Sequence, residues 1–338
     1  MSETAADSPT AMRPAPEGTP TPRWGTPGPG TAGPGTAGAG TAGAGTGRTG
    51  ATLAGLVAIG LWSLLALLTA SSGAVPPFQL TAICFAVAAA IGAGVALARG
   101  AGLAWLRQPW PVWALGVGGL FGYHFFYFTA LRNAPAVEAG LIAYLWPLLI
   151  IVFSAFLPGE RLRAGHVLGG LLGLAGAVLV VTRGTGLSFD ARFATGYGAA
   201  VVCALTWSGY SVASRRHADV PSLIVTGYCA VSAALALACH LAFEETAWPQ
   251  GAVEWAATLG LGLGPVGAAF YVWDHAVKRG DIQLLGAASY GAPVLSTLAL
   301  VAAGLATASW KLALAVALVT AGAILAANAG RDERRQER

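Results

Sequence analysis

Charge is scarce in this sequence. Charged residues make up 10% of its 338 residues, against about 25% in a typical soluble domain, while apolar residues make up 55%. A chain with so few charges cannot cover a folded surface exposed to water, which argues against a soluble protein. We therefore expect an all-α integral membrane protein that crosses the bilayer many times.

Several chemistries are missing as well. The sequence has no HExxH or GxSxG motif and no pair of aspartates at mid-membrane depth, which argues against an intramembrane enzyme. None of the four cysteines stands at metal-ligand spacing, so we expect neither a metal site nor a cofactor. The sequence also lacks a ring of like charges, which a channel would need, so we do not expect a channel. The net charge of +4 reflects cytoplasmic loops rather than a nucleic-acid surface.

The first 50 residues lack any apolar run. They consist mainly of Pro, Gly, Thr and Ala in near-repeats such as GTAGPGTAGAGTAGAGTG, which excludes a signal peptide and a buried core. We expect residues 1–50 to form a disordered cytoplasmic tail and residues 331–338 to form a second, short cytoplasmic tail.

The rest of the chain repeats itself. The segment from Phe128 to Pro147 recurs without a gap 146 residues later, from Asp274 to Pro293. Matched pairs include Ala130 and Ala276, Gly140 and Gly286, and Tyr144 and Tyr290, and Trp62-Ser63 similarly matches Trp207-Ser208. We therefore predict two copies of one unit, in residues 51–190 and 191–330.

Apolar runs predict ten transmembrane helices, five in each copy. Each run is close to the ~20 residues that span ~30 Å of hydrocarbon. Because five is odd, the second copy must cross the membrane in the opposite direction, and we expect two inverted five-helix repeats around a central cavity. The predicted spans are 52–70, 77–98, 111–131, 136–157, 164–182, 196–214, 222–243, 255–277, 283–305 and 309–329.

Positive charges support this placement. With the N-terminus in the cytoplasm, the inside segments hold 15 of the 19 Lys and Arg residues, and the outside segments hold only Arg132, Arg183, Arg192 and Lys311. This bias indicates that both termini are cytoplasmic. We expect a multi-pass protein of the cell (plasma or inner) membrane.

Large aromatic side chains at mid-membrane depth are the main candidates for a binding site. Trp62, Trp146 and Trp207 lie about 11 residues inside their predicted helices, where an indole N–H needs a partner. Tyr123 and Tyr127 stand four residues apart on one helical face. Tyr144 lies at a similar depth in the next span.

Ionisable residues in the spans have a functional and a structural interpretation. His124 at mid-depth favours a site, although a neutral His hydrogen-bonded between helices is the alternative. Asp274 could act as a proton or substrate gate, or it could simply pair with a neighbouring base. Glu138, near an outer helix end, could pair with Arg132 in the same way.

Two prolines fall in the middle of equivalent helices. Pro147 and Pro293 each remove a backbone N–H, which frees the carbonyls of Ala143 and Ser289. Broken helices at matching places in two inverted halves point to a site near the midplane. The freed carbonyls and the Ser289 hydroxyl could then receive an amino group.

Particular segments resemble a known family. The stretches ATLAGLVAIGLWS, AVEAGLIAYLWP, GERLRAGHVLGGLLGLAGAVLVV and AASYGAPVLS are similar to the EamA-type drug/metabolite transporter superfamily, and within it to the YddG-type aromatic amino acid exporters. The resemblance covers about residues 51–329. It implies an inverted repeat with a central cavity and export of aromatic and other bulky neutral amino acids. The substrate-binding residues that it implies are Trp62, Tyr123, His124, Tyr127, Tyr144, Trp146, Trp207 and Ser289.

The expected function is therefore export of these amino acids by alternating access. Export of multiple drugs or quaternary cations, such as methyl viologen, on the same scaffold is the alternative, because aromatic rings also bind cations. The expected partners are a small-molecule substrate and the lipid bilayer. The sequence does not specify the oligomeric state and is compatible with a monomer.

Overall fold

The computed structural model describes residues 39–183, 187, 189–302, 304 and 307–336, with side chains described between residues 47 and 330. Residues 42–338 form one compact unit, and the description below concerns that unit. Every regular element in the described residues is a helix, as the sequence predicts.

The first repeat contains eight α-helices, several of which pair end to end within one span. They are α1 (Ala39–Trp62), α2 (Leu65–Ala70), α3 (Pro77–Ala98), α4 (Trp110–Val117), α5 (Tyr123–Asn133), α6 (Ala136–Ala143), α7 (Trp146–Ser154) and α8 (Ala164–Val181). Helix α1 begins inside the stretch that the sequence assigns to the N-terminal tail, and residues 1–38 of that tail lie outside the described residues.

The second repeat is built in the same way. Its helices are α9 (Ala194–Ala213), α10 (Val225–Phe243), α11 (Ala252–Leu263), α12 (Ala269–Arg279), α13 (Ile282–Ser289), α14 (Gly291–Ala302) and α15 (Trp310–Gln336). Short 3-10 turns are η1 (Ala104–Leu106), η3 (Ala191–Phe193), η4 (Ser214–His217) and η5 (Ser222–Ile224). Helix α15 continues beyond residue 330, where the sequence predicts the C-terminal tail to begin.

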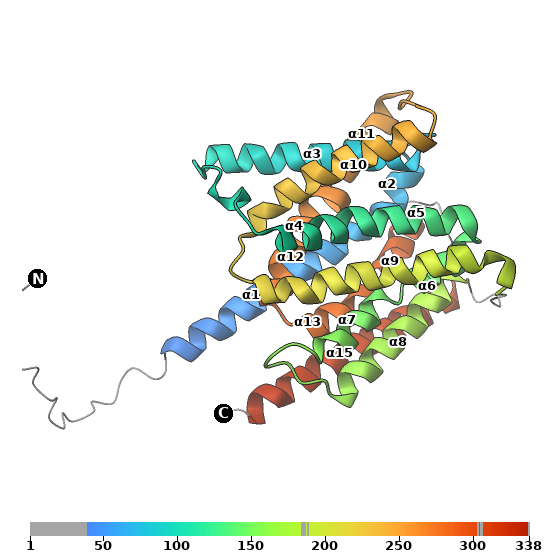
Figure 1. Ribbon diagram of the computed structural model, residues 1–338. Coiled ribbons are helices and arrows are strands. Elements are labelled where there is room, and N and C mark those ends of the chain that lie inside the picture. Colours follow the sequence, from blue (N-terminus) through green and yellow to red (C-terminus); the bar gives the residue numbers. More distant parts are fainter. Residues whose placement is uncertain (1–38, 184–186, 188, 303, 305–306, 337–338) are drawn as a thin grey trace, which may run out of the picture. The chain divides into compact units, whose positions relative to one another are not determined.

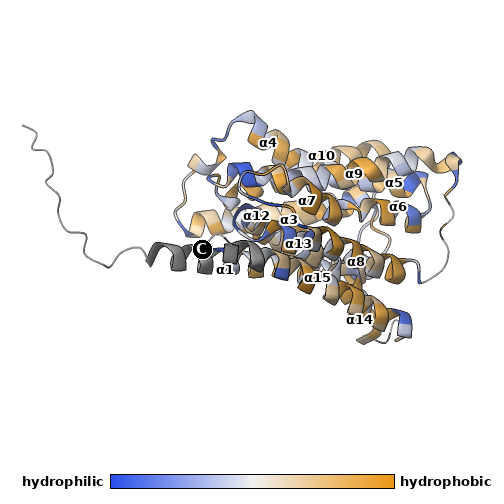
Figure 2. Ribbon diagram, turned by 90° about the horizontal axis from the view of Figure 1, so that it is seen from below, coloured by the Kyte–Doolittle hydropathy of each residue, from blue (hydrophilic) through white to orange (hydrophobic). Residues whose placement is uncertain are grey.

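The predicted spans agree with the helices. Nine helical stretches in the described residues are long and apolar enough to cross a membrane. The tenth predicted span is the 20-residue helix α9, which is less apolar because it carries Thr, Tyr, Trp, Ser and Gly residues. Hydrophilic residues gather mainly near the helix ends, as expected for helices that cross hydrocarbon (Figure 2).

Both repeats are interrupted at matching positions. A π-helical turn, η2 (Gly118–Gly122), joins α4 to α5, and a second one, η6 (Gly264–Ala268), joins α11 to α12 at the same offset of 146 residues. Likewise, α6 ends just before Tyr144 and α13 ends just before Tyr290, so each break directly precedes a predicted proline kink. π-Turns and prolines are common causes of such breaks.

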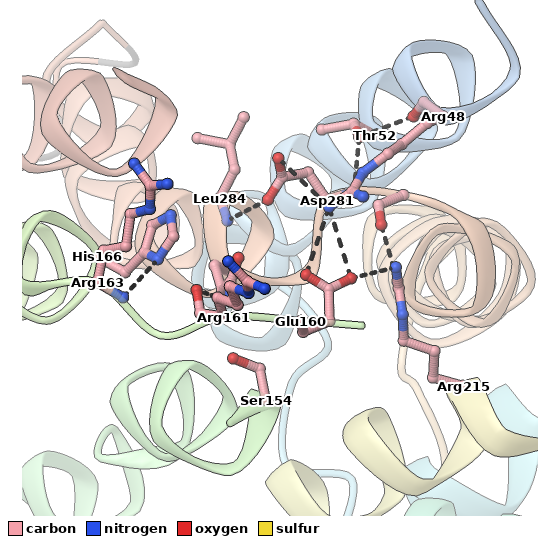
Figure 3. A network of polar contacts seen from close by, with 12 residues as sticks. Arg48, Thr52, Ser154, Glu160, Arg161, Arg163, His166, Arg215, Asp281 and Leu284 are labelled. Atoms are coloured by element: carbon pink, nitrogen blue, oxygen red, sulfur yellow. Dashed lines mark hydrogen bonds and ion pairs between the residues drawn. The ribbon is translucent and has the colours of Figure 1, made fainter. Parts of the chain in front are cut away.

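One end of the helix bundle, which we call the inner end, is held by a network of charges (Figure 3). The Glu160 carboxylate pairs with the Arg215 guanidinium and lies 3.5 Å from Nη2 of Arg48. Arg48 Nη2 is also 3.8 Å from Oδ2 of Asp281. These residues belong to the start of the first span in α1, the α7–α8 loop, turn η4 and the α12–α13 loop. An even number of spans therefore separates any two of them.

The opposite end, the outer end, joins the other set of loops. Glu244, which follows α10, lies 2.8 Å from Arg132 at the end of α5 and accepts a 3.0 Å hydrogen bond from the Phe78 backbone N–H at the start of α3. Lys311 Nζ donates to the Arg183 carbonyl at 2.8 Å, which brings the α8–α9 and α14–α15 loops together. The spans thus alternate in direction, and the second repeat is inverted relative to the first.

Arg132 does not make the ion pair with Glu138 that the sequence allows. It instead reaches Glu244 and lies over the Phe78 ring, 5.4 Å from its centroid. Glu244 is the better partner because its carboxylate also accepts hydrogen bonds from the N-terminus of α3, where the helix dipole favours an anion.

Equivalent helices of the two repeats pack together (Figure 1). Helix α3 lies along α10, and α8 lies along α15. The α8–α15 contact depends on glycine, because a Cβ atom on Gly169 would collide with the carbonyl oxygen of Gly322. Small residues at this spacing allow membrane helices to approach closely, which the sequence also indicates.

Candidate functional site

Four tryptophan rings meet inside the bundle. The Trp62 ring lies 6.0 Å from Trp146 and 5.8 Å from Trp207, measured between centroids, and both contacts are edge to face. The Trp273 ring lies 4.9 Å from Trp62 and 6.3 Å from Trp207. Phe270 completes the group, 5.6 Å from Trp207. We call these five residues, from spans of both repeats, the aromatic cluster.

Backbone breaks help to position the cluster. Helix α1 ends at Trp62, whose Nε1–H donates a 3.0 Å hydrogen bond to the Pro265 carbonyl in the π-turn η6. A π-turn departs from the regular α-helical bonding pattern, and the indole supplies this carbonyl with a donor. The partner that a mid-membrane indole requires is therefore a backbone group of the other repeat.

Helix α5 places three further predicted residues against the cluster. The Tyr123 and Tyr127 rings are stacked, with centroids 6.0 Å apart and planes 4° apart. Tyr123 also lies 5.4 Å from Trp207. The ring of His124 lies 6.1 Å from Phe270, and its Nδ1 is 2.8 Å from the Leu120 carbonyl, to which it can donate in the Nδ1–H tautomer.

The breaks near Tyr144 and Tyr290 are bonded across the repeats. The Leu148 backbone N–H, just after Pro147, donates a 3.1 Å hydrogen bond to the Tyr290 hydroxyl. Tyr290 is fully buried, whereas Tyr144 is half-buried. Tyr290, at the break in the second repeat, thus accepts a hydrogen bond from the backbone just after the break in the first repeat.

Ser289 differs from the other predicted residues. Its side chain is fully buried, and its hydroxyl donates a 2.7 Å hydrogen bond to the Leu285 carbonyl one turn earlier. The hydroxyl is thus engaged within its own helix in this conformation. A serine that donates to the carbonyl at i−4 commonly bends a membrane helix, which is consistent with the break that follows.

The rings differ in how much surface they leave open. Trp146, Trp207 and Trp273 are buried. Tyr123, His124, Tyr127 and Tyr144 are only half-buried. Open surface on such deep residues is typical of side chains that line an internal space. The described residues contain no cluster of His, Cys, Asp or Glu suited to a metal ion.

Two cluster members were missed by the sequence analysis, and the repeat itself could have found them. Trp273 stands 146 residues after Tyr127, and Phe270 stands 146 residues after His124. Applying the repeat offset to the candidates in α5 therefore predicts the aromatic face of α12. The missed signal was that Tyr127 and His124 match ring-bearing residues of another type, Trp273 and Phe270, at the repeat offset.

Comparisons with known proteins agree with the duplicated architecture. A model of the EamA-like transporter family matches residues 48–182 and, a second time, residues 194–328. Aromatic amino acid exporter YddG of Ancylobacter novellus is 59% identical over 270 residues, which are 80% of this chain and 94% of that protein. Aromatic amino acid exporter YddG of Escherichia coli is 27% identical over 200 residues, or 55% of this chain and 66% of that protein.

Structural similarity extends over most of the chain. A solved crystal structure with 58% sequence identity has a TM-score of 0.80 and covers 84% of this chain and 99% of its own chain. The family model, the similar proteins and the paired helix breaks all describe one architecture, that of a transporter and not of an enzyme. The chain belongs to the EamA-like transporter family.

Proposed function

We propose that this transporter exports aromatic and other bulky neutral amino acids by alternating access, and that the aromatic cluster with Tyr123, His124, Tyr127 and Tyr144 receives the substrate side chain. The observation that carries the proposal is the open surface of these four residues beside a group of tryptophan rings. Edge-to-face and offset ring contacts contribute about 0.5–1.5 kcal/mol each beyond burial of area, so such a lining favours a ring-bearing substrate.

The names of similar proteins support this choice of substrate. Both relatives described above are named aromatic amino acid exporters, and the more similar of them is aligned over nearly its whole length. Export of organic cations is the second candidate, since tryptophan faces also bind cations. We favour zwitterions because the Asp274 carboxylate, which directly follows the cluster residue Trp273, already has the Lys278 ammonium as its counter-charge.

The orientation in the membrane follows from charge. We propose that the inner end faces the cytoplasm of a cell in whose plasma or inner membrane the protein resides. Arg48, Arg215 and Arg216 lie at that end, and cytoplasmic segments are enriched in Arg and Lys. Residues 51–190 and 191–330 are proposed as the two repeats, working within a monomer.

The paired breaks suggest where the protein bends. Pro147 and Pro293 stand just after breaks that fall at the same place in the two repeats. We assign these positions as hinges, because a missing backbone hydrogen bond lets the two helix segments change their relative angle. Rocking at both hinges would expose the aromatic cluster to each end in turn.

A transport panel in proteoliposomes tests the function. Phenylalanine and tryptophan are expected to be transported faster than aliphatic amino acids or methyl viologen. Trp146→Ala should reduce aromatic amino acid transport at least tenfold, since it removes a ring that three other tryptophans contact. Trp110→Ala, on a tryptophan that is 77% exposed, is the matched control and should retain transport. Equal transport by Trp146→Ala and the parent, at equal amounts of protein, would exclude the cluster as the substrate site.

A further inference from the structure

A buried ion pair adjoins the aromatic cluster. Asp274 and Lys278 stand one turn apart on α12, and Lys278 Nζ lies 2.8 Å from Oδ2 of Asp274. Their side chains are only 1% and 2% exposed. Tyr210 of α9 donates a 3.2 Å hydrogen bond to the other carboxylate oxygen, and Lys278 also donates to the Val220 carbonyl at 3.0 Å. The pair is thus fully engaged and shielded from solvent.

Stability alone gives a weak reason for such a pair. A buried ion pair is often no more stabilising than apolar residues of similar size, whereas removing only one partner leaves an unpaired buried charge and is strongly destabilising. The repeated architecture does not require the Asp274–Lys278 pair either. Phe128 and Arg132 occupy the equivalent positions in α5, and Arg132 pairs with Glu244 at the outer end. The buried pair is specific to the second repeat.

The pair lies between the aromatic cluster and a cavity. On one side, the Tyr210 ring lies 5.3 Å from the Trp207 ring, and Trp273 directly precedes Asp274. On the other side, Lys278 lines a cavity of about 510 Å³ together with Leu157, Pro158, Arg215 and Arg216. A solute that moved along α12 from this inner-end cavity to the aromatic cluster would pass Lys278 and Asp274.

The proposed substrate needs charged partners along this route. A free amino acid carries an α-ammonium and an α-carboxylate, and burying either group without a counter-charge is costly. The rings of the aromatic cluster provide no permanent charge. Asp274 and Lys278 provide one charge of each sign, held at a spacing similar to that of the two groups on one α-carbon.

We propose that Asp274 and Lys278 bind the charged head group of a zwitterionic amino acid on its way to the aromatic cluster, with Asp274 receiving the α-ammonium and Lys278 receiving the α-carboxylate. This inference rests on the proposed function and specifies how that substrate class is selected. When the substrate binds, the Asp274–Lys278 ion pair is replaced by two ion pairs, Asp274 with the α-ammonium and Lys278 with the α-carboxylate. Every buried charge therefore keeps a partner. A substrate with a single charge leaves either Asp274 or Lys278 unpaired and is disfavoured.

The test compares phenyl-bearing ligands that carry both, one or neither of the two charged groups. Phenylalanine, phenethylamine, 3-phenylpropionate and the uncharged N-acetylphenylalaninamide would each compete against labelled phenylalanine for binding to the purified protein in nanodiscs. The parent should bind phenylalanine at least tenfold more tightly than either singly charged analogue. The double variant Asp274→Asn/Lys278→Gln, which leaves no unpaired charge, should lose most of that preference while its affinity for the uncharged analogue stays within about twofold.

Controls separate this inference from a structural role and from the proposed function. Arg279→Gln, on the exposed neighbour in α12, should keep the parent preference. If the pair only supports packing, the double variant will bind all four ligands more weakly by the same factor, and that result overturns the proposal. An unchanged preference of the double variant for phenylalanine over the singly charged analogues also overturns it. If the parent fails to bind phenylalanine and the uncharged analogue alike, the proposed function fails first. An intact preference in Trp146→Ala at reduced overall affinity would support two separate sites.

Discussion

Glu160 is expected to hold the inner end closed, and its replacement provides a quantitative test of that view. The Glu160 side chain is 4% exposed and pairs with Arg215, which is 17% exposed, and with Arg48, which is 34% exposed. The three residues come from the α7–α8 loop, turn η4 and the start of the first span in α1. Opening the inner end must separate these segments and therefore break the pairs.

The magnitude follows from burial. Burial lowers the pKa of the Arg215 guanidinium from its ordinary value, with the Glu160 carboxylate acting in the opposite direction. Because an arginine remains charged at neutral pH, Glu160→Gln removes the carboxylate that pairs directly with this cation in the closed state. Removing one partner of a buried pair costs about 3 kcal/mol or more, and the exposed Arg48 pair adds about 0–1 kcal/mol. A change of 3 kcal/mol shifts the closed-to-open ratio by roughly a hundredfold.

The assay is a distance measurement across the inner end. Spin labels on Arg161→Cys and Asp219→Cys, two exposed loop positions, would report the separation of the α7–α8 and η4–η5 segments by double electron–electron resonance. The partly exposed native Cys239 would be replaced by Ser. Glu160→Gln should increase the population at long distance, and Asp190→Asn, which removes the exposed pair with Arg192, should not. Identical distributions for Glu160→Gln and the parent would refute the role assigned to the network.

Two further substitutions test the packing of the repeats. Tyr290→Phe should lower the free energy of unfolding by about 1 kcal/mol, because the half-buried Leu148 N–H loses its acceptor. Tyr197→Phe, whose hydroxyl has no partner among the described residues, should change unfolding in detergent much less. Gly169→Leu should lower the thermal midpoint by several degrees, since its side chain would meet the Gly322 carbonyl, whereas Gly198→Ala faces open space and should not. An unaltered midpoint in Gly169→Leu would show that α8 and α15 are farther apart than described here.

Much of the fold could be predicted from the sequence because the bilayer imposes a length and a polarity on every span. The 146-residue repeat and the odd number of spans per copy together predict the inverted arrangement. The breaks were predictable at Pro147 and Pro293, where the backbone chemistry is unambiguous. The π-turn at Gly118–Gly122 was not, since its sequence GGLFG resembles ordinary small-residue helix packing. In Gly264–Ala268, Pro265 does indicate a break, but not that the break is a π-turn.

The contacts between helices were harder to predict. Trp62 was recognised as needing a hydrogen-bond acceptor, but its partner, the Pro265 carbonyl, lies 203 residues away in sequence. Arg132 has Glu138 nearby in sequence, but the carboxylate that it contacts in the structure is that of Glu244. Which partner is used depends on the lateral order of the helices, and periodicity along one chain contains no information about that order.

The charges at the inner end have no equivalent under the internal symmetry. Pro135 stands where the second repeat has Asp281, and α2 ends at Ala70 where α9 leads into Arg215. Ion pairs at the outer end join a different set of helices around Glu244. Two identical halves would make the inward-open and outward-open states equal in free energy, whereas the inner-end ion pairs stabilise one of them. A transporter without substrate would then be closed at the inner end. Substrate binding would have to provide the free energy for opening, so that the empty protein changes state slowly and allows little leakage.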